Sequence, residues 1–103
     1  MSTSSTERSP ALAESVSVTD DALTVYVADG RSIAVPIAWY PRLAHGTVAE
    51  RANWRLIGRG EGIHWPDLDE DISVESLLVG SRSMESQASL EKWLALRGRR
   101  PLA

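Results

Sequence analysis

The sequence predicts an α+β fold, with a small antiparallel sheet built from hairpins, short helices packed against it and a C-terminal helix. Apolar and polar residues alternate between residues 16 and 37, which is the two-residue period of half-buried strands. Strand pairs are followed by short helical segments, and this order favours α+β over a parallel α/β sheet. The 103 residues are enough for one core without covalent staples.

We expect three parts along the chain: a disordered leader over residues 1–12, the α+β core over residues 13–82, and a C-terminal helix with a basic tail over residues 83–103. Residues 1–10 contain six Ser or Thr and no aliphatic residue after Met1. Such a segment cannot bury enough apolar area to offset the conformational entropy that it would lose on ordering.

Composition excludes several classes of site and protein. The chain has no Cys, which excludes disulfides, thiolate metal sites and a Cys nucleophile. The 11 basic and 14 acidic residues give a formal charge of −3, which argues against a general nucleic-acid coat. No apolar run approaches the roughly 18 residues of a membrane span, and no apolar signal-peptide stretch opens the sequence. We therefore expect a cytoplasmic protein with no membrane partner and no cofactor.

The first hairpin can be predicted down to its register. Its apolar runs are Val16–Val18, Leu23–Val27 and Ile33–Ile37. Asp29-Gly30 lies between the last two runs and is a strong hairpin signal. A two-residue loop would turn the two apolar sets to opposite faces, whereas a three-residue loop, Ala28-Asp29-Gly30, pairs Val25 with Ile33 and gives one apolar face. We therefore predict a type I turn with a bulge and a positive φ at Gly30.

Short helical segments follow this hairpin. Pro36 has no N–H to donate to a ladder, so the third strand lies at an edge or ends there. Pro41 can open a helical turn because its fixed φ suits the first helical position. Thr47 and Glu50 have the spacing of a capping box, which predicts a helix from Val48 to about Arg55.

A second hairpin is predicted from two short apolar runs around a Gly-rich turn. Leu56-Ile57 and Ile63–Trp65 flank residues 58–62, where three Gly in five residues indicate a tight connection. The turn lacks the Lys followed by Ser or Thr of a phosphate-binding P-loop, so we interpret it as structural. Pro66 is expected to end the second strand of this hairpin.

Two more helices are expected after the second hairpin. Ser73 is placed to cap a short helix that stops at Gly80. A last helix is predicted from about Met84 to Arg97. Its residues at helical spacing form one stripe: Leu90, Trp93, Leu94 and Arg97.

The densest polar cluster combines one histidine with four carboxylates: His64, Asp67, Asp69, Glu70 and Asp71. The aspartate spacing resembles an EF-hand loop, but Ile72 and Leu78 occupy the positions that need Gly and Glu, so we reject an EF-hand and predict no metal site. Such carboxylates can also serve as a general acid/base pair. We favour a solvated acidic loop ahead of a helix N-terminus, which can act as a docking surface for a basic partner.

His45 and His64 are the two histidines, which excludes a three-histidine metal site, and no Gly-x-Ser-x-Gly elbow accompanies them. We interpret His64, in a predicted strand, as a structural histidine. Four Trp occur in a chain without Phe: Trp39, Trp54, Trp65 and Trp93. We favour core packing for Trp54. For Trp39 and Trp65, we expect either core packing or a role as an interface hot spot. Trp93 belongs to a helix that can dock on its own domain or on another chain.

Several short runs together carry a family resemblance: Asp29-Gly30-Arg31, Trp39–Leu43, Arg51–Trp54, Gly62–Pro66 and Leu68–Ser73. In combination they resemble domain of unknown function 2442, a family of short bacterial proteins. The similarity spans about Val16 to Gly80, and the tail Ser86–Leu90 is similar to longer family members. The resemblance implies a small α+β domain without an established activity and without agreed catalytic residues.

The resemblance also implies a context. Family members often form one half of a two-gene pair with another small protein, like toxin–antitoxin modules, and some carry an appended helix-turn-helix domain. One further predicted helix follows the core here, which argues against a complete appended DNA-binding domain.

Three hypotheses follow. The first is a protein-interaction module, the antitoxin-like member of a bacterial pair, whose partner is a small basic protein from a neighbouring gene. Its candidate binding residues are Trp39, Tyr40, Arg42, His64, Trp65, Asp67, Asp69, Glu70 and Asp71. The second is a DNA-binding regulator that contacts phosphate through Arg97, Arg99 and Arg100. The third is a small carboxylate-dependent hydrolase that uses Asp69, Glu70, Asp71 and His64.

Overall fold

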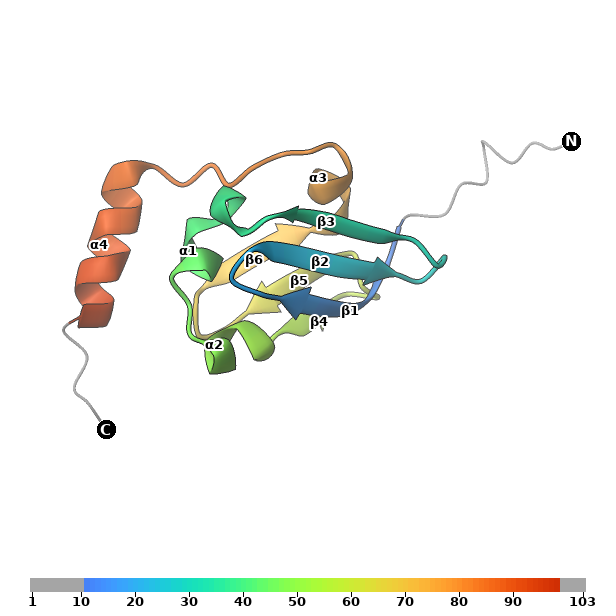
Figure 1. Cartoon of the computed structure of the whole chain (residues 1–103), viewed down its shortest axis with the longest axis horizontal. Coiled ribbons are helices and arrows are strands. Elements are labelled where there is room, and N and C mark those ends of the chain that lie inside the picture. Colours follow the sequence, from blue (N-terminus) through green and yellow to red (C-terminus); the bar gives the residue numbers. More distant parts are fainter. Residues whose placement is uncertain (1–10, 99–103) are drawn as a thin grey trace, which may run out of the picture.

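Residues 11–98, the part of the chain that this computed structural model describes, form two three-stranded antiparallel sheets and several short helices (Figure 1). The first sheet contains β1 (Ala13–Val18), β2 (Ala22–Val27) and β3 (Ser32–Pro36) in that order. The second contains β4 (Arg55–Ile57), β5 (Gly62–Trp65) and β6 (Glu70–Ser73). The helical elements are the 3₁₀ turn η2 (Ile37–Trp39), α1 (Pro41–Ala44), α2 (Val48–Ala52), α3 (Val74–Leu78) and α4 (Gln87–Gly98). The predicted α+β class is confirmed, with the strands divided between two small sheets.

The register predicted for the first hairpin is confirmed. Val25 pairs with Ile33 across β2 and β3, and the next apolar pair joins Leu23 to Val35. Gly30 has a φ of 99°, a conformation that strains any residue with a side chain. Pro36 is the last residue of β3, which is an edge strand of its sheet. Local turn chemistry and strand period therefore determined this part of the fold.

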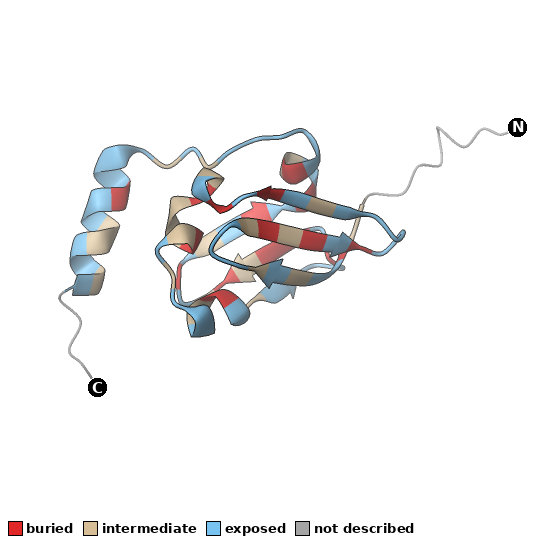
Figure 2. Ribbon diagram, viewed as in Figure 1, coloured by how far each residue is buried: buried red, intermediate tan, exposed pale blue. Residues whose placement is uncertain are grey.

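The core lies between the two sheets. Figure 2 shows the buried residues concentrated on the strands and on the short helices close to them, with little burial along α4. Each central strand contributes completely buried side chains, Leu23 and Val25 from β2 and Ile63 and Trp65 from β5. Burying a side chain of this kind stabilises the fold by about 1.5–3 kcal/mol.

The predicted helix caps are confirmed, but α2 is shorter than predicted. The Thr47 side chain accepts a hydrogen bond from the Glu50 N–H, and the Glu50 carboxylate accepts one from the Thr47 N–H. The helix ends at Ala52 instead of Arg55, because Arg55 begins β4 and pairs with β5. Backbone pairing of the next strand thus ended a helix whose start the sequence had located correctly.

The predicted cap and stop of α3 are confirmed, whereas α4 begins later than predicted. Ser73 caps α3, with its side chain accepting from the Ser76 N–H at 3.0 Å, and Gly80 beyond the helix has a φ of 77°. The last helix begins at Gln87 instead of Met84, because the Ser86 side chain accepts from the Ser89 N–H at 3.0 Å and caps the helix there.

Residues 1–10 and 99–103 lie outside the described residues, so the predictions of a disordered leader and of a role for Arg99 and Arg100 stay predictions. Leu12, which we had placed in the leader, accepts a backbone hydrogen bond from Ala28 at 2.8 Å. Between residues 11 and 98, no helix is long and apolar enough to cross a membrane.

Candidate functional site

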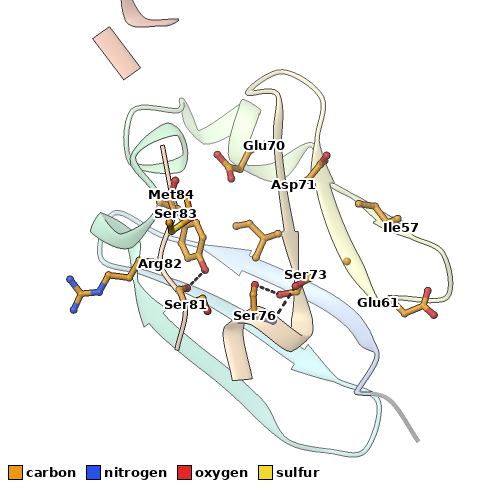
Figure 3. Close-up of a pocket in the computed structure, with 13 residues that line it drawn as sticks. Ile57, Glu61, Glu70, Asp71, Ser73, Ser76, Ser81, Arg82, Ser83 and Met84 are labelled. Atoms are coloured by element: carbon orange, nitrogen blue, oxygen red, sulfur yellow. Dashed lines mark hydrogen bonds between the residues drawn. The ribbon is translucent and has the colours of Figure 1, made fainter. Parts of the chain in front are cut away.

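A groove of about 580 Å³ lies along β6, between this strand and the segment Ser81–Met84 that leads to α4 (Figure 3). We call this cavity the β6 groove. Tyr40 and Ser76 also line it, and Ile57 lines it from β4. The volume falls within the range of about 300–1,000 Å³ that is usual for ligand sites.

Glu70 is the carboxylate set most deeply in this groove. It pairs with Trp65 across the sheet, so its side chain shares the face that carries the buried residues of β5. Burial raises the pKa of Glu70 to about 7, and the positive charge of Arg42 partly opposes this shift. Among the described residues, none donates a hydrogen bond to the Glu70 carboxylate. Every fully buried side-chain polar atom of these residues has a hydrogen-bond partner, so the Glu70 oxygens are not fully buried. The unpaired Glu70 oxygens are therefore open to a ligand in the groove.

Arg42 on α1 lies beside this site, but its guanidinium is already engaged. It donates to Glu85 from Nη2 at 2.6 Å and to the Asp69 carbonyl from Nη1 at 3.2 Å, and it stacks on the Trp93 ring at 4.9 Å. The Arg42 guanidinium lowers the pKa of the Glu85 carboxyl. Arg42 thus connects the turn before β6 to α4 and its leading segment.

Asp71 and His64 lie on the other face of the second sheet. His64 pairs with Asp71 across β5 and β6, and its Nδ1 contacts the Asp71 carboxylate. Figure 3 shows Glu70 and Asp71 pointing away from each other across β6, as neighbouring residues of a strand must. Placing Glu70 and Asp71 in a loop was therefore a wrong prediction, since both belong to a strand. His64 is half-buried and bonded, which fits a structural histidine.

The acidic cluster of the sequence is thus divided among separate places. Asp67 accepts a hydrogen bond from the Asn53 side chain at 2.9 Å. The Asp69 side chain is 87% exposed and lies 3.5 Å from Arg42, at a residue with a φ of 51°. Within residues 11–98, no group of three or more histidine or carboxylate side chains could hold a metal ion. The predicted acid/base set therefore does not converge on one point.

Two predicted binding residues are core residues instead. Trp65 is completely buried, and its Nε1–H donates to the Arg51 carbonyl at 3.0 Å. Tyr40 is buried as well, and its hydroxyl donates to the Ser81 carbonyl at 2.7 Å. Assigning Trp65 to a binding surface is therefore wrong, because its contacts stabilise the core. Tyr40 contributes to the groove only as part of its wall.

The other tryptophans are half-buried and pack against the core. The guanidinium of Arg82 stacks on Trp39 at 4.7 Å beside the groove. Trp93 contacts two guanidiniums, Arg42 and Arg97, the latter at 4.7 Å. Trp93 thus docks α4 on its own domain, one of the two possibilities that the sequence left open.

Sequence reasoning missed several residues of this region. Glu85 binds Arg42 across 43 positions, and no local pattern indicates that pair. Arg51 is buried and donates to the Leu43 carbonyl and the Ala44 carbonyl, both at 2.8 Å. The role of the segment Ser81–Met84 was missed as well, because its polar composition carries no strand or helix period and only Met84 was assigned to a helix.

Comparison with known proteins identifies the fold. Two solved structures share it at 22% identity: a protein of unknown function from Rhodospirillum rubrum, with a TM-score of 0.63 over 78% of this chain and 96% of that chain, and an uncharacterized protein from Chromobacterium violaceum, with a TM-score of 0.61 over 84% and 75%. No curated protein matches. The model of the family described as protein of unknown function DUF2442 matches residues 13–83. The chain therefore belongs to the DUF2442 family.

Proposed function

We propose that this chain is a protein-interaction module that binds a basic partner protein through the surface around the β6 groove, as the antitoxin-like member of a bacterial two-protein pair. The observation that carries the proposal is the groove of about 580 Å³ beside the unpaired carboxylate of Glu70. Arg42 acts on Glu70 only as a nearby charge, and a cationic side chain entering the groove would supply the directly hydrogen-bonded counter-charge that Glu70 lacks among the described residues.

The charge of the surrounding surface supports a basic partner. Residues 60–81 contain six carboxylates and no Lys or Arg. Asp69 and Asp71 remain largely exposed, with 87% and 68% of their side chains accessible. An acidic surface of this kind accelerates encounter with a positively charged partner and repels a negatively charged one.

Apolar side chains at the rim support a macromolecular partner. Met84 and Ile57 line the groove and are 96% and 43% exposed. Exposed apolar side chains that flank a polar cavity are typical of protein-interaction sites.

Nucleic-acid binding has less support within residues 11–98. The Arg97 guanidinium donates to Glu50 at 2.8 Å and stacks on Trp93, so it is committed to holding α4. A protein partner is the function that the geometry of the described residues supports best.

Co-purification from the native operon tests the proposal. We expect the tagged chain to retain the small basic protein of the neighbouring gene at low salt and to release it as salt rises. Absence of a complex between the two purified proteins at low salt would contradict the proposal.

A charge-reversal pair tests the surface. Asp69→Lys with Glu70→Lys should lower the association rate by about tenfold at low salt. A matched control, Glu14→Lys with Asp21→Lys, makes the same change in net charge on β1 and on the turn between β1 and β2. Thermal melts of each variant alone must show a folded protein; if the first variant unfolds, Asp69→Asn replaces it, because Asn tolerates a positive φ, with Asp21→Asn as the control of equal charge change. Equal rates for the folded test and control variants would count against the proposed surface.

A further inference from the structure

The outer edge of β6 is open along the groove. β6 is the last strand of its sheet, and β5 pairs with it on one side only. The segment Ser81–Met84 lines the other side of the groove, but two of its N–H groups are bonded elsewhere: Ser81 donates to the Ser76 carbonyl and Ser83 to the Trp39 carbonyl. The groove therefore separates β6 from the segment that would otherwise cover its edge.

The hydrogen-bond ladder shows which backbone groups face the groove. Val74 N–H donates to the Glu61 carbonyl at 2.9 Å, so this pair is a hydrogen-bonded one. Hydrogen-bonded and non-hydrogen-bonded pairs alternate along an antiparallel ladder. Counting along the β5–β6 register, Ser73 and Asp71 belong to non-hydrogen-bonded pairs. Their N–H groups and the Asp71 carbonyl therefore point away from β5 and into the groove, and no backbone group among residues 11–98 is bonded to them.

The charge beside this edge indicates which kind of segment can bind there. Two β6 strands from two copies would bring Glu70 and Asp71 of one copy against the carboxylates of the other, which is unfavourable for cross-strand neighbours. A neutral segment would leave Glu70 unpaired in a groove with less water, which costs free energy. A segment carrying a Lys or Arg avoids both costs.

We infer that the β6 groove binds an extended basic segment of the partner protein, which adds as a fourth strand to the free edge of β6 and places a Lys or Arg side chain against Glu70. This inference rests on the proposed function and specifies the partner segment. Side chains of an added strand alternate, so those facing Glu70 are basic and those facing Ile57 on the opposite side are apolar.

A peptide series tests the strand addition. The probe is a short capped peptide of alternating Val and Lys, added to the full chain and followed through its amide NMR signals. We expect the largest shifts at Asp71, Ser73 and Ser81–Met84. N-methylation of alternate peptide N–H groups should weaken binding by about tenfold or more, because it removes the donors for the Asp71 carbonyl. Absence of shifts at β6, or equal binding of the N-methylated peptide, overturns the inference.

A second peptide tests the role of charge. The matched peptide of alternating Val and Gln should bind the wild-type chain about tenfold more weakly than the Lys peptide, and Glu70→Gln should remove that preference. A preference that survives in Glu70→Gln overturns the assignment of the basic side chain to Glu70.

A pair of variants tests the edge with the partner protein itself. Ser73→Pro removes the N–H that faces the groove, and its φ of −89° lies close to the range of proline. Ser73→Ala loses the same helix cap but keeps the N–H. We expect partner affinity to fall by about tenfold in Ser73→Pro relative to Ser73→Ala.

The outcomes separate this inference from the proposed function. A partner that binds both Ser73 variants equally, yet is lost on reversing the acidic charges, overturns the strand addition and leaves the proposed function standing. A partner that does not bind the wild-type chain overturns the proposed function. If the chain alone dimerises and Ser73→Pro abolishes the dimer, the edge of β6 binds a second copy and the inference is overturned. If Ser73→Pro does not fold, the peptide series tests the strand addition instead.

Discussion

The space between the two sheets and the attachment of α4 are stabilised by different forces. Between the sheets, several aliphatic side chains and Trp65 are completely buried. α4 fully buries a single residue, Leu90; its half-buried Trp93 packs against the core, and charged groups make its other contacts. Arg97 donates to Glu50 at one end of this contact and Arg42 donates to Glu85 at the other, with Trp93 between the two guanidiniums.

This difference has consequences for stability. Apolar burial is insensitive to pH and is strengthened by many salts, whereas ion pairs weaken with added salt and with protonation of the carboxylates. We therefore expect α4 to be released under conditions that leave the two sheets folded. Substitutions in each region can break or sharpen this comparison.

Two tryptophans give the largest expected contrast. Trp65→Ala should destabilise the protein by about 3–5 kcal/mol, because it leaves a cavity between the sheets and an unpaired Arg51 carbonyl. Trp93→Ala should cost far less global stability, since Trp93 contributes mainly stacking with Arg42 and Arg97. Chemical denaturation measures both, and a comparable loss for the two variants would show that α4 is part of the core.

Glu70→Gln should stabilise the isolated protein at high pH. The folded-state pKa of about 7 lies above the ordinary value of 4.5, so the ionised form is disfavoured by folding. The wild-type contribution is therefore fully present below about pH 4.5 and is lost as pH rises through about 7. The variant should exceed the wild type by about 1–3 kcal/mol at pH 8 and by less at pH 5. Thermal melts at the two pH values check this, and a difference independent of pH would contradict it.

Gly30→Val should destabilise the first hairpin by about 1–2 kcal/mol, because a β-branched residue is strained at a positive φ. No atom lies within 4 Å of the position that a Cβ would take, so the cost comes from the backbone alone. Gly30→Asn is the matched control and should cost less. Urea denaturation measures both, and equal stability of Gly30→Val and the wild type would contradict the turn geometry.

The ion pair between Arg97 and Glu50 should have the smallest effect on global stability and the clearest effect on α4. Arg97→Gln should cost about 0.2–1 kcal/mol, with Lys92→Gln on the exposed side of the helix as control. The pKa of Glu50 is lowered from 4.5 to about 2, chiefly by Arg97, so its contribution is present above about pH 4.5 and lost as pH falls to about 2. Protection of the α4 amides against hydrogen exchange, measured from the exchange rate relative to the intrinsic rate at the same pH, should fall in Arg97→Gln and at low pH; unchanged protection would show that the Arg97–Glu50 pair does not hold the helix.

The residues that sequence reasoning located correctly are those whose cause is local. The positive φ at Gly30, the capping box of Thr47 and Glu50 and the cap at Ser73 depend on neighbouring dihedral angles and on side chains a few positions apart. The family could likewise be predicted, since its motifs are short runs in the chain. The predicted helix boundaries were less accurate where the chain entered a strand, as at Arg55, or where a cap was not recognised, as at Ser86.

The candidate site required the tertiary structure. The sequence by itself indicated a cluster of acidic residues, and the strand pairing of β6 then separated Glu70 from Asp71 by turning them to opposite faces. The groove exists because Ser81–Met84 folds back beside β6, and Arg42 reaches Glu85 only through packing of distant segments. Local patterns determine turns, caps and strand period because those depend on a few consecutive dihedral angles. Which carboxylate is buried depends on long-range packing, and only the folded chain decides it.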